Sequence, residues 1–224
     1  MPVPSIKDAW KKAWNSPIKR RQLILIIVLI PVFLFTLPHF FDYIEKRNGV
    51  LLNDWLLAQI PPHNVSVLIF TVIWGMILLI LYRSLHNPSI FITYCLTLAI
   101  VTVVRITCIS LVPLSPPAGL IPLVDPLSGV FYGEAAITRD LFFSGHTATL
   151  MVIFLCLERK TDKTIGFLAV CAVAVLLVIQ HIHYTIDILA AIVVVYVTHS
   201  ITSRFIFKNR RRRKKLRRAR SVIE

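Results

Sequence analysis

The sequence predicts an all-α fold, a polytopic membrane protein built as a six-transmembrane-helix bundle. Hydrophobic residues occupy 56% of the 224 positions and charged residues only 16%, and the mean hydropathy is +0.74. These values exclude a disordered chain and are unusual for a soluble domain. Lys and Arg outnumber Asp and Glu by 25 to 11, but most of them lie outside the apolar runs. The charge therefore indicates a membrane protein and not a nucleic-acid-binding one.

Six apolar segments are expected to cross the bilayer, and the fourth is the shortest. Its 15 residues extend roughly 22 Å as a helix, whereas the hydrocarbon core of a bilayer is about 30 Å thick. Its outer end is therefore expected to lie below the bilayer surface, or in a locally thinned membrane. The predicted crossings are residues 22–41, 65–82, 88–112, 144–158, 165–182 and 183–204.

The chain divides into an N-terminal segment 1–21, a six-helix domain 22–207 and a basic tail 208–224. Basic residues concentrate in the N-terminal segment, after the fourth crossing and in the tail, and six crossings place all three on one side. The positive-inside rule makes that side cytosolic, together with both termini. Trp10 and Trp14 lie four residues apart beside lysines, which predicts an amphipathic helix in the headgroup region. We expect the tail to bind anionic lipid headgroups.

The polar residues of the membrane domain concentrate at two places on its outer side. Ser144-Gly145-His146 begins the fourth crossing, and His183 begins the sixth, followed by Asp187. Because Asp187 lies one helical turn after His183, it can accept the imidazole proton and orient the ring for nucleophilic attack. His146 can then protonate a leaving oxygen and later take a proton from an incoming hydroxyl. The alternative is structural: interfacial histidines without a chemical role.

Four residues near the histidines are predicted to bind the substrate, three of them at its phosphate. Gly145 permits close backbone approach, and Ser144 with the first amides of its helix can donate to an anion. Arg105 lies about 25 Å along an apolar helix from its cytosolic start, so it can reach the same site and neutralise phosphate oxygens. A structural arginine paired with an acidic residue is the alternative. Asp140 can hydrogen-bond His146 or a headgroup amine. Together these residues predict phosphoryl transfer.

Other polar or reactive side chains are interpreted as structural. Asp54 is expected to cap or position an interfacial turn, and His181 is expected to be an interfacial bystander. The four cysteines lie within apolar stretches and lack the spacing of a zinc site or a disulfide framework. They are interpreted as buried thiols.

Two motifs resemble a known family. Asp140-Leu-Phe-Phe-Ser-Gly-His-Thr147 and His183-Tyr-Thr-Ile-Asp187 resemble the third and fourth motifs of the sphingomyelin synthase family, a branch of the type 2 phosphatidic acid phosphatase superfamily. The resemblance implies that His183 is the nucleophile, Asp187 its partner and His146 the acid and base. It also implies transfer of a phospho-headgroup from a glycerophospholipid donor to a lipid hydroxyl, such as that of ceramide or diacylglycerol, without a metal or another cofactor.

The sequence also departs from this pattern. Thr138-Arg139 stands where the family has Cys-Gly, which leaves the donor headgroup open. The wider superfamily's Lys-x6-Arg-Pro motif is absent, which argues against an ordinary lipid phosphatase. Three hypotheses therefore remain: a transferase with its site on the lumenal or periplasmic side, a lipid phosphate hydrolase that uses the same residues, and an inert membrane scaffold whose basic tail is the working part.

Overall fold

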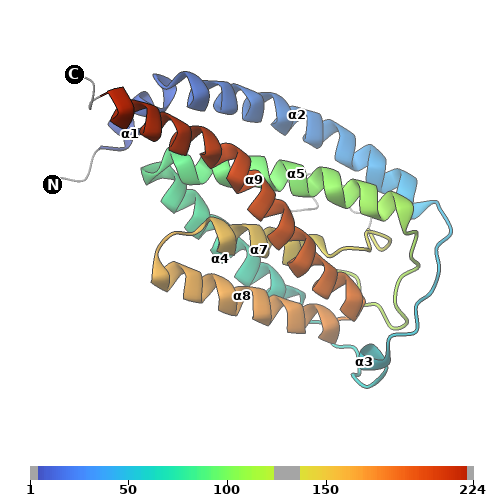
Figure 1. Cartoon of the computed structure of the whole chain (residues 1–224). Coiled ribbons are helices and arrows are strands. Elements are labelled where there is room, and N and C mark those ends of the chain that lie inside the picture. Colours follow the sequence, from blue (N-terminus) through green and yellow to red (C-terminus); the bar gives the residue numbers. More distant parts are fainter. Residues whose placement is uncertain (1–4, 124–136, 221–224) are drawn as a thin grey trace.

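The computed structural model describes residues 5–123 and 137–220, with side chains described as far as Arg204. These residues fold into helices and connecting loops (Figure 1), with one isolated parallel bridge between Val50 and Leu114. The helices are α1 Ile6–Trp14, α2 Pro17–Glu45, α3 Trp55–Ala58, α4 Ser66–His86, α5 Pro88–Leu111, α7 Gly145–Cys156, α8 Lys160–Ile179 and α9 Thr185–Arg220.

The expected all-α polytopic fold is confirmed, but the expected count of six spans is not met in full. Within the described residues, five helices are long and apolar enough to cross a membrane: α2, α4, α5, α8 and the part of α9 from Thr185 to Arg204. Helix α7, which corresponds to the predicted fourth crossing, has 12 residues. It therefore extends only about 18 Å and falls short of the hydrocarbon thickness.

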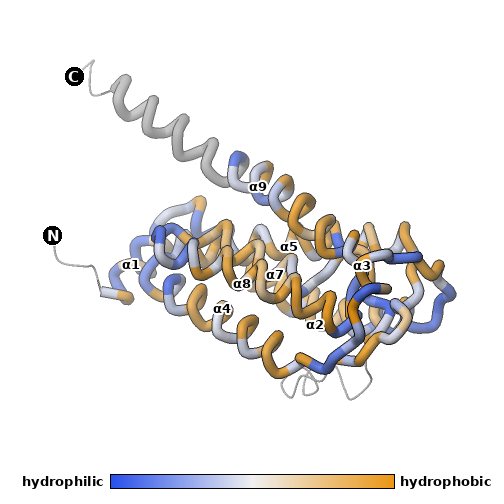
Figure 2. The backbone as a smooth tube through the Cα atoms, turned by 90° about the horizontal axis from the view of Figure 1, so that it is seen from below, coloured by the Kyte–Doolittle hydropathy of each residue, from blue (hydrophilic) through white to orange (hydrophobic). Residues whose placement is uncertain are grey.

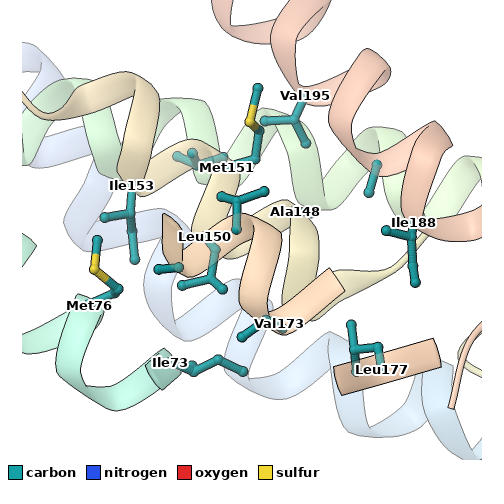
Figure 3. Packing of buried hydrophobic residues seen from close by; sticks show 14 of the residues in the cluster. Ile73, Met76, Ala148, Leu150, Met151, Ile153, Val173, Leu177, Ile188 and Val195 are labelled. Carbon is teal, nitrogen blue, oxygen red and sulfur yellow. The ribbon is translucent and has the colours of Figure 1, made fainter. Parts of the chain in front are cut away.

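Helix α7 is the centre of the bundle. It packs against α4, α5, α8 and α9, and none of its residues is exposed, with Leu150, Val152 and Ile153 fully inaccessible. Figure 3 shows Leu150 and Ile153 among apolar side chains of α4 and α8. A helix that is apolar all round is stable when neighbours enclose it. Because these neighbours and not lipid cover α7, it does not have to match the bilayer thickness itself.

Helix α2 lies at the edge of the bundle and packs against α1 and α5. Most of its apolar side chains point outward; Ile27 is 62% exposed and Phe35 is 74% exposed. Figure 2 shows hydrophobic residues along the helices and hydrophilic residues gathered at α1 and in the loops at the opposite end. An exposed apolar surface of this extent is typical of a helix that faces lipid.

The two ends of the bundle differ. Helix α1 docks against the turn between α4 and α5, where the Trp10 indole N–H donates to the Leu85 carbonyl over 2.9 Å and its ring meets Phe91 edge-on. Lys19 donates to Ser89 over 2.9 Å. Helix α3 and the loops that follow α2 and α5 lie at the other end (Figure 1), which we name the loop end. The candidate catalytic residues lie at the loop end.

Candidate active site

The structure brings the two histidine motifs together at the loop end. The ring centroids of His146 and His183 are 6.1 Å apart and the rings are tilted by 59°. The backbone N–H of Ser144 donates to the carbonyl of Asp187 over 3.2 Å. This bond joins the start of α7 directly to the first turn of α9, so the geometry of one histidine depends on that of the other.

His183 and Asp187 form a close, buried pair. The distance from His183 Nδ1 to Asp187 Oδ2 is 3.5 Å, longer than an ordinary hydrogen bond. The same carboxylate oxygen accepts the Tyr184 backbone N–H over 3.2 Å. His183 is 2% exposed and Asp187 is fully buried. Because hydrogen bonds at catalytic sites often shorten only when substrate binds, this geometry suits an orienting carboxylate.

Arg105 lies over the start of α7. Its Nε donates to the Phe143 carbonyl over 3.0 Å, and its Nη2 makes an ion pair with Asp140. A Cβ atom on Gly145 would lie 2.7 Å from both Cζ and Nη2 of this arginine. Gly145 therefore permits close approach to its backbone, as the sequence suggested, and in the structure the guanidinium of Arg105 is the group that lies there. Asp140 contacts the arginine, which is the structural alternative considered for Arg105.

Ser144 holds the start of α7. Its hydroxyl oxygen accepts the Thr147 backbone N–H over 3.3 Å, as a helix N-cap, and the residue is fully buried. The predicted donation from Ser144 to a phosphate stays a prediction. On the other side of the helix start, the Phe70 ring packs edge-on against the His146 ring, with centroids 6.2 Å apart.

Several buried polar atoms at the site make no hydrogen bond to the described part of the chain. Buried polar groups in proteins are paired in the great majority of cases. Buried polar atoms without a hydrogen bond to the described residues also occur away from the site, as at Trp74. At the site, however, several of them lie around the two motifs, which indicates a binding site for a polar ligand. These atoms are Arg139 Nη1, Asp140 Oδ1, Thr147 Oγ1, His183 Nδ1 and Asp187 Oδ1.

Asp54 has a larger role than the sequence suggested. It caps α3, as expected, by accepting the backbone N–H groups of Leu56 and Leu57 over 3.1 and 3.3 Å. It also accepts the backbone N–H of Thr185 over 2.6 Å and the Thr185 hydroxyl over 3.1 Å. Partial burial raises the pKa of Asp54, but these hydrogen bonds outweigh it and hold the pKa below its ordinary value. An Asp before an apolar turn signals the local cap only.

His181, which we expected to be a bystander, ties two loops to the active-site turn. Its Nδ1 lies 2.9 Å from the Ala118 carbonyl oxygen and its Nε2 lies 2.8 Å from that of Ile60. The preceding residue, Gln180, is fully buried and accepts the Val65 backbone N–H over 3.0 Å. No periodicity in the sequence marks these contacts, because each joins segments that are far apart in the chain.

Glu45, at the end of α2, was also missed. Its carboxylate accepts the backbone N–H groups of Thr138 and Arg139, each over 2.6 Å, and the Thr138 hydroxyl over 3.0 Å. These two residues directly precede Asp140, the ion-pair partner of Arg105. The end of a peripheral helix is thus connected to the side of the site that contains Arg105 and Asp140.

The described side chains provide no ready-made metal site. Within residues 5–123 and 137–204, no group of three or more His, Cys, Asp or Glu side chains is arranged to hold a metal ion. The described residues of the site contribute two imidazoles, a buried carboxylate and a guanidinium.

The part of the chain that contains the two histidine motifs is similar to a known protein family. Residues 139–204 match the family described as PAP2 superfamily C-terminal. The matched region contains His146, His183 and Asp187 but not Arg105. No curated protein matches the chain. The match supports membership of this chain in the type 2 phosphatidic acid phosphatase superfamily, and with it a lipid phosphatase or phosphotransferase type of function.

Proposed function

We propose that the chain is an integral-membrane phosphotransferase that moves a phospho-headgroup from a glycerophospholipid to a lipid hydroxyl, such as that of ceramide or diacylglycerol. The observation that carries the proposal is the approach of His146 and His183, whose ring centroids are 6.1 Å apart, with Asp187 3.5 Å from the second ring. The separation of the rings is about two hydrogen-bond lengths, so one phosphate group can reach both.

In the first step, Nε2 of His183 attacks the phosphorus atom, an N–P bond forms, and the bond from phosphorus to the glycerol oxygen breaks. His146 protonates that oxygen, so diacylglycerol leaves. In the second step, His146 takes the proton of the acceptor hydroxyl, the acceptor oxygen attacks phosphorus, and the N–P bond breaks. Asp187 stabilises the positive imidazole of His183, and Arg105 neutralises phosphate oxygens.

The burial of the nucleophile supports transfer over hydrolysis. His183 is 2% exposed and Asp187 is fully buried, so water has little access to a phosphohistidine formed there. Hydrolysis of a lipid phosphate shares the first step and differs only in using water as the acceptor. The resemblance of the two motifs to sphingomyelin synthases supports the same choice.

The orientation follows from the distribution of charge between the two ends of the bundle. Lys and Arg residues gather at α1, at the start of α2 and at the start of α8, all at the end away from the site (Figure 1). Under the positive-inside rule this end is cytosolic and the site is lumenal or periplasmic. Anionic lipid binding by the tail 208–224 stays a prediction, because its side chains lie outside the described residues.

The experiment is product analysis with headgroup-labelled phospholipid and purified protein, with and without ceramide or diacylglycerol. We expect label in the acceptor lipid, and an acid-labile labelled protein when the acceptor is omitted. His183→Ala should lower turnover by at least about 10³-fold. The matched control is His63→Ala, which alters an exposed histidine at the loop end.

Two results would contradict the proposal. Release of the free labelled headgroup regardless of acceptor would show a hydrolase. Wild-type turnover by His183→Ala would show that another residue is the nucleophile.

A further inference from the structure

The loop between α2 and α4 holds the turn that carries His183 at three neighbouring residues. The Leu52 backbone N–H donates to the Tyr184 hydroxyl over 3.2 Å, and the Ile60 carbonyl lies 2.8 Å from His181 Nε2. The third contact is between Asp54 and Thr185. Each contact is on a residue within two positions of the proposed nucleophile, so this loop determines where the turn lies.

The contact between Asp54 and Thr185 is the shortest of the three and involves both carboxylate oxygens. Oδ2 accepts the Thr185 backbone N–H over 2.6 Å, and Oδ1 accepts the Thr185 hydroxyl over 3.1 Å. Thr185 is the first residue of α9, and its N–H has no acceptor within the helix. A carboxylate at this place satisfies the N–H and is favoured by the helix dipole. Asp54 thus caps a helix 131 residues further along the chain.

The position of His183 depends on the backbone of its turn more than on bonds made by its own ring. Its Nδ1 is buried without a hydrogen bond to the described residues, and the nearest carboxylate oxygen, on Asp187, is 3.5 Å away. Thr185 lies midway between these two residues in sequence. A displacement of Thr185 therefore changes the distance and angle between the imidazole and its carboxylate.

We propose that Asp54 is a positioning residue for the nucleophile: through Thr185 it fixes the start of α9 and thereby the geometry of His183 and Asp187. This inference rests on the proposed function of His183. Asp54 acts through the backbone and hydroxyl of Thr185 and takes no part in the bond changes. A misplacement of about 1 Å at a reacting group can lower a rate by roughly 10²-fold, which sets the expected size of the effect.

Asp54 also caps α3, and a test has to separate the two roles. Serine is as good a local N-cap as aspartate, so Asp54→Ser can still accept the amides of Leu56 and Leu57. Its shorter side chain cannot reach Thr185 as the carboxylate does. If capping of α3 were the important role, Asp54→Ser would behave like the wild type. If the contact with Thr185 matters, Asp54→Ser would behave like Asp54→Ala.

The experiment measures kcat and KM for headgroup transfer in the full-length protein. We expect Asp54→Ser and Asp54→Ala to lower kcat by about 10- to 100-fold, with KM for the phospholipid within about twofold of wild type, since the proposed anion-binding residues are unchanged. The matched control is Asp42→Asn, which removes an exposed carboxylate from the last turn of α2 and should leave both constants unchanged. Wild-type kcat in Asp54→Ser overturns the proposal.

Two further variants keep the outcome decisive. Thr185→Val removes only the hydroxyl contact, and combined with Asp54→Ser it should cost less than the product of the two single losses, because both changes break one interaction. If Asp54→Ser does not fold, Thr185→Val alone carries the test, and a wild-type kcat refutes the proposal. Turnover by His183→Ala would instead refute the proposed function. Loss of turnover in His183→Ala with full activity in Asp54→Ser would refute this inference alone.

Discussion

Substitution of Gly145 by alanine tests whether the guanidinium of Arg105 takes part in catalysis from the place where it lies. The added Cβ would be 2.7 Å from both Cζ and Nη2 of Arg105, and 3.1 Å from Nη1. The backbone of α7 is held by the Ser144 cap, whereas the guanidinium is the end of a flexible side chain. The arginine is therefore the group that moves.

The effect on folding is expected to be small. Alanine is favoured over glycine in a helix by up to about 1 kcal/mol. The displaced Arg105 loses its hydrogen bond to the Phe143 carbonyl, and hydrogen bonds of charged groups contribute roughly 1.5–3 kcal/mol. The balance is a destabilisation of about 0.5–2 kcal/mol, against a stability of about 5–15 kcal/mol for a typical domain. Gly145→Ala should therefore fold.

The effect on activity is expected to be large. Removal of one positioned donor from a transition-state anion costs about 10²–10³-fold in kcat, and the displaced guanidinium no longer faces the phosphate. The assay is headgroup transfer by purified protein, with thermal unfolding in detergent measured on the same sample. The matched control is Gly75→Ala in α4, where an added Cβ meets no atom within 4 Å. This control should keep wild-type activity.

The decisive measurement is a double-mutant cycle with Arg105→Ala. Once the guanidinium is absent, the added methyl group of Gly145→Ala has nothing to displace, so the double variant should be as active as Arg105→Ala alone. Wild-type activity in Gly145→Ala would refute the reasoning. A further loss of activity when Gly145→Ala is added to Arg105→Ala would show that the glycine acts in some other way.

Three further predictions concern other contacts. Hydrogen bonds hold the pKa of Asp54 below its ordinary value of 3.8, so the stability that Asp54 contributes is present above that value and is lost as the pH falls through the lowered pKa. The thermal unfolding temperature of Asp54→Ala should therefore fall less on acidification than that of the wild type. An equal fall in both proteins would contradict this prediction. Glu45→Gln removes one of the oxygens that hold the backbone before Asp140. The KM for the phospholipid should therefore rise several-fold, with a smaller change in kcat. An unchanged KM would show that this contact does not affect substrate binding. Asp162→Asn breaks the ion pair with Arg83 that joins α8 to α4 at the end away from the site. Thermal stability should therefore fall while kcat stays at the wild-type value. A loss of kcat in folded protein would contradict a purely structural role for this pair.

Five of the six crossings were predictable within the described residues, because hydropathy is a local property of a run of residues. Their ends were less so. Helix α2 begins at Pro17 and continues to Glu45, because a helix does not have to stop at the hydrocarbon boundary. Helix α8 ends at Ile179 because Gln180 and His181 leave the helix, the latter with a φ of 56°, which is unusual for a residue other than glycine. That departure is fixed by the loops that contact these side chains.

The convergence of the two motifs was predictable from the charge distribution and the number of crossings, which place both motifs at one end. The contacts that hold them were not. Asp54 and Thr185 are 131 residues apart, and Glu45 contacts residues that are 93 and 94 positions away. A carboxylate that binds a distant backbone amide leaves no periodic pattern, because any exposed amide can serve as its donor.

The two helices that begin at the site differ in the charges that lie at the positive end of their helix dipoles. At α9, the Thr185 N–H is bound by Asp54, and the N–H of Tyr184, just before the helix, is bound by Asp187. Two carboxylates therefore already compensate the positive end of the α9 dipole. An incoming phosphate would meet both of these negative charges there, so the start of α9 is unfavourable for binding it.

The start of α7 has the opposite character. Its cap is the uncharged hydroxyl of Ser144, and the guanidinium that rests against Gly145 offsets the charge of its partner Asp140. The positive end of the α7 dipole is therefore left to attract an anion. We therefore expect the phosphate to bind at α7, beside His146, while His183 approaches it from the turn before α9. In the proposed mechanism, the carboxylates on the α9 side would keep His183 in place without competing for the phosphate, and this separation would let one site both hold and attack the same group.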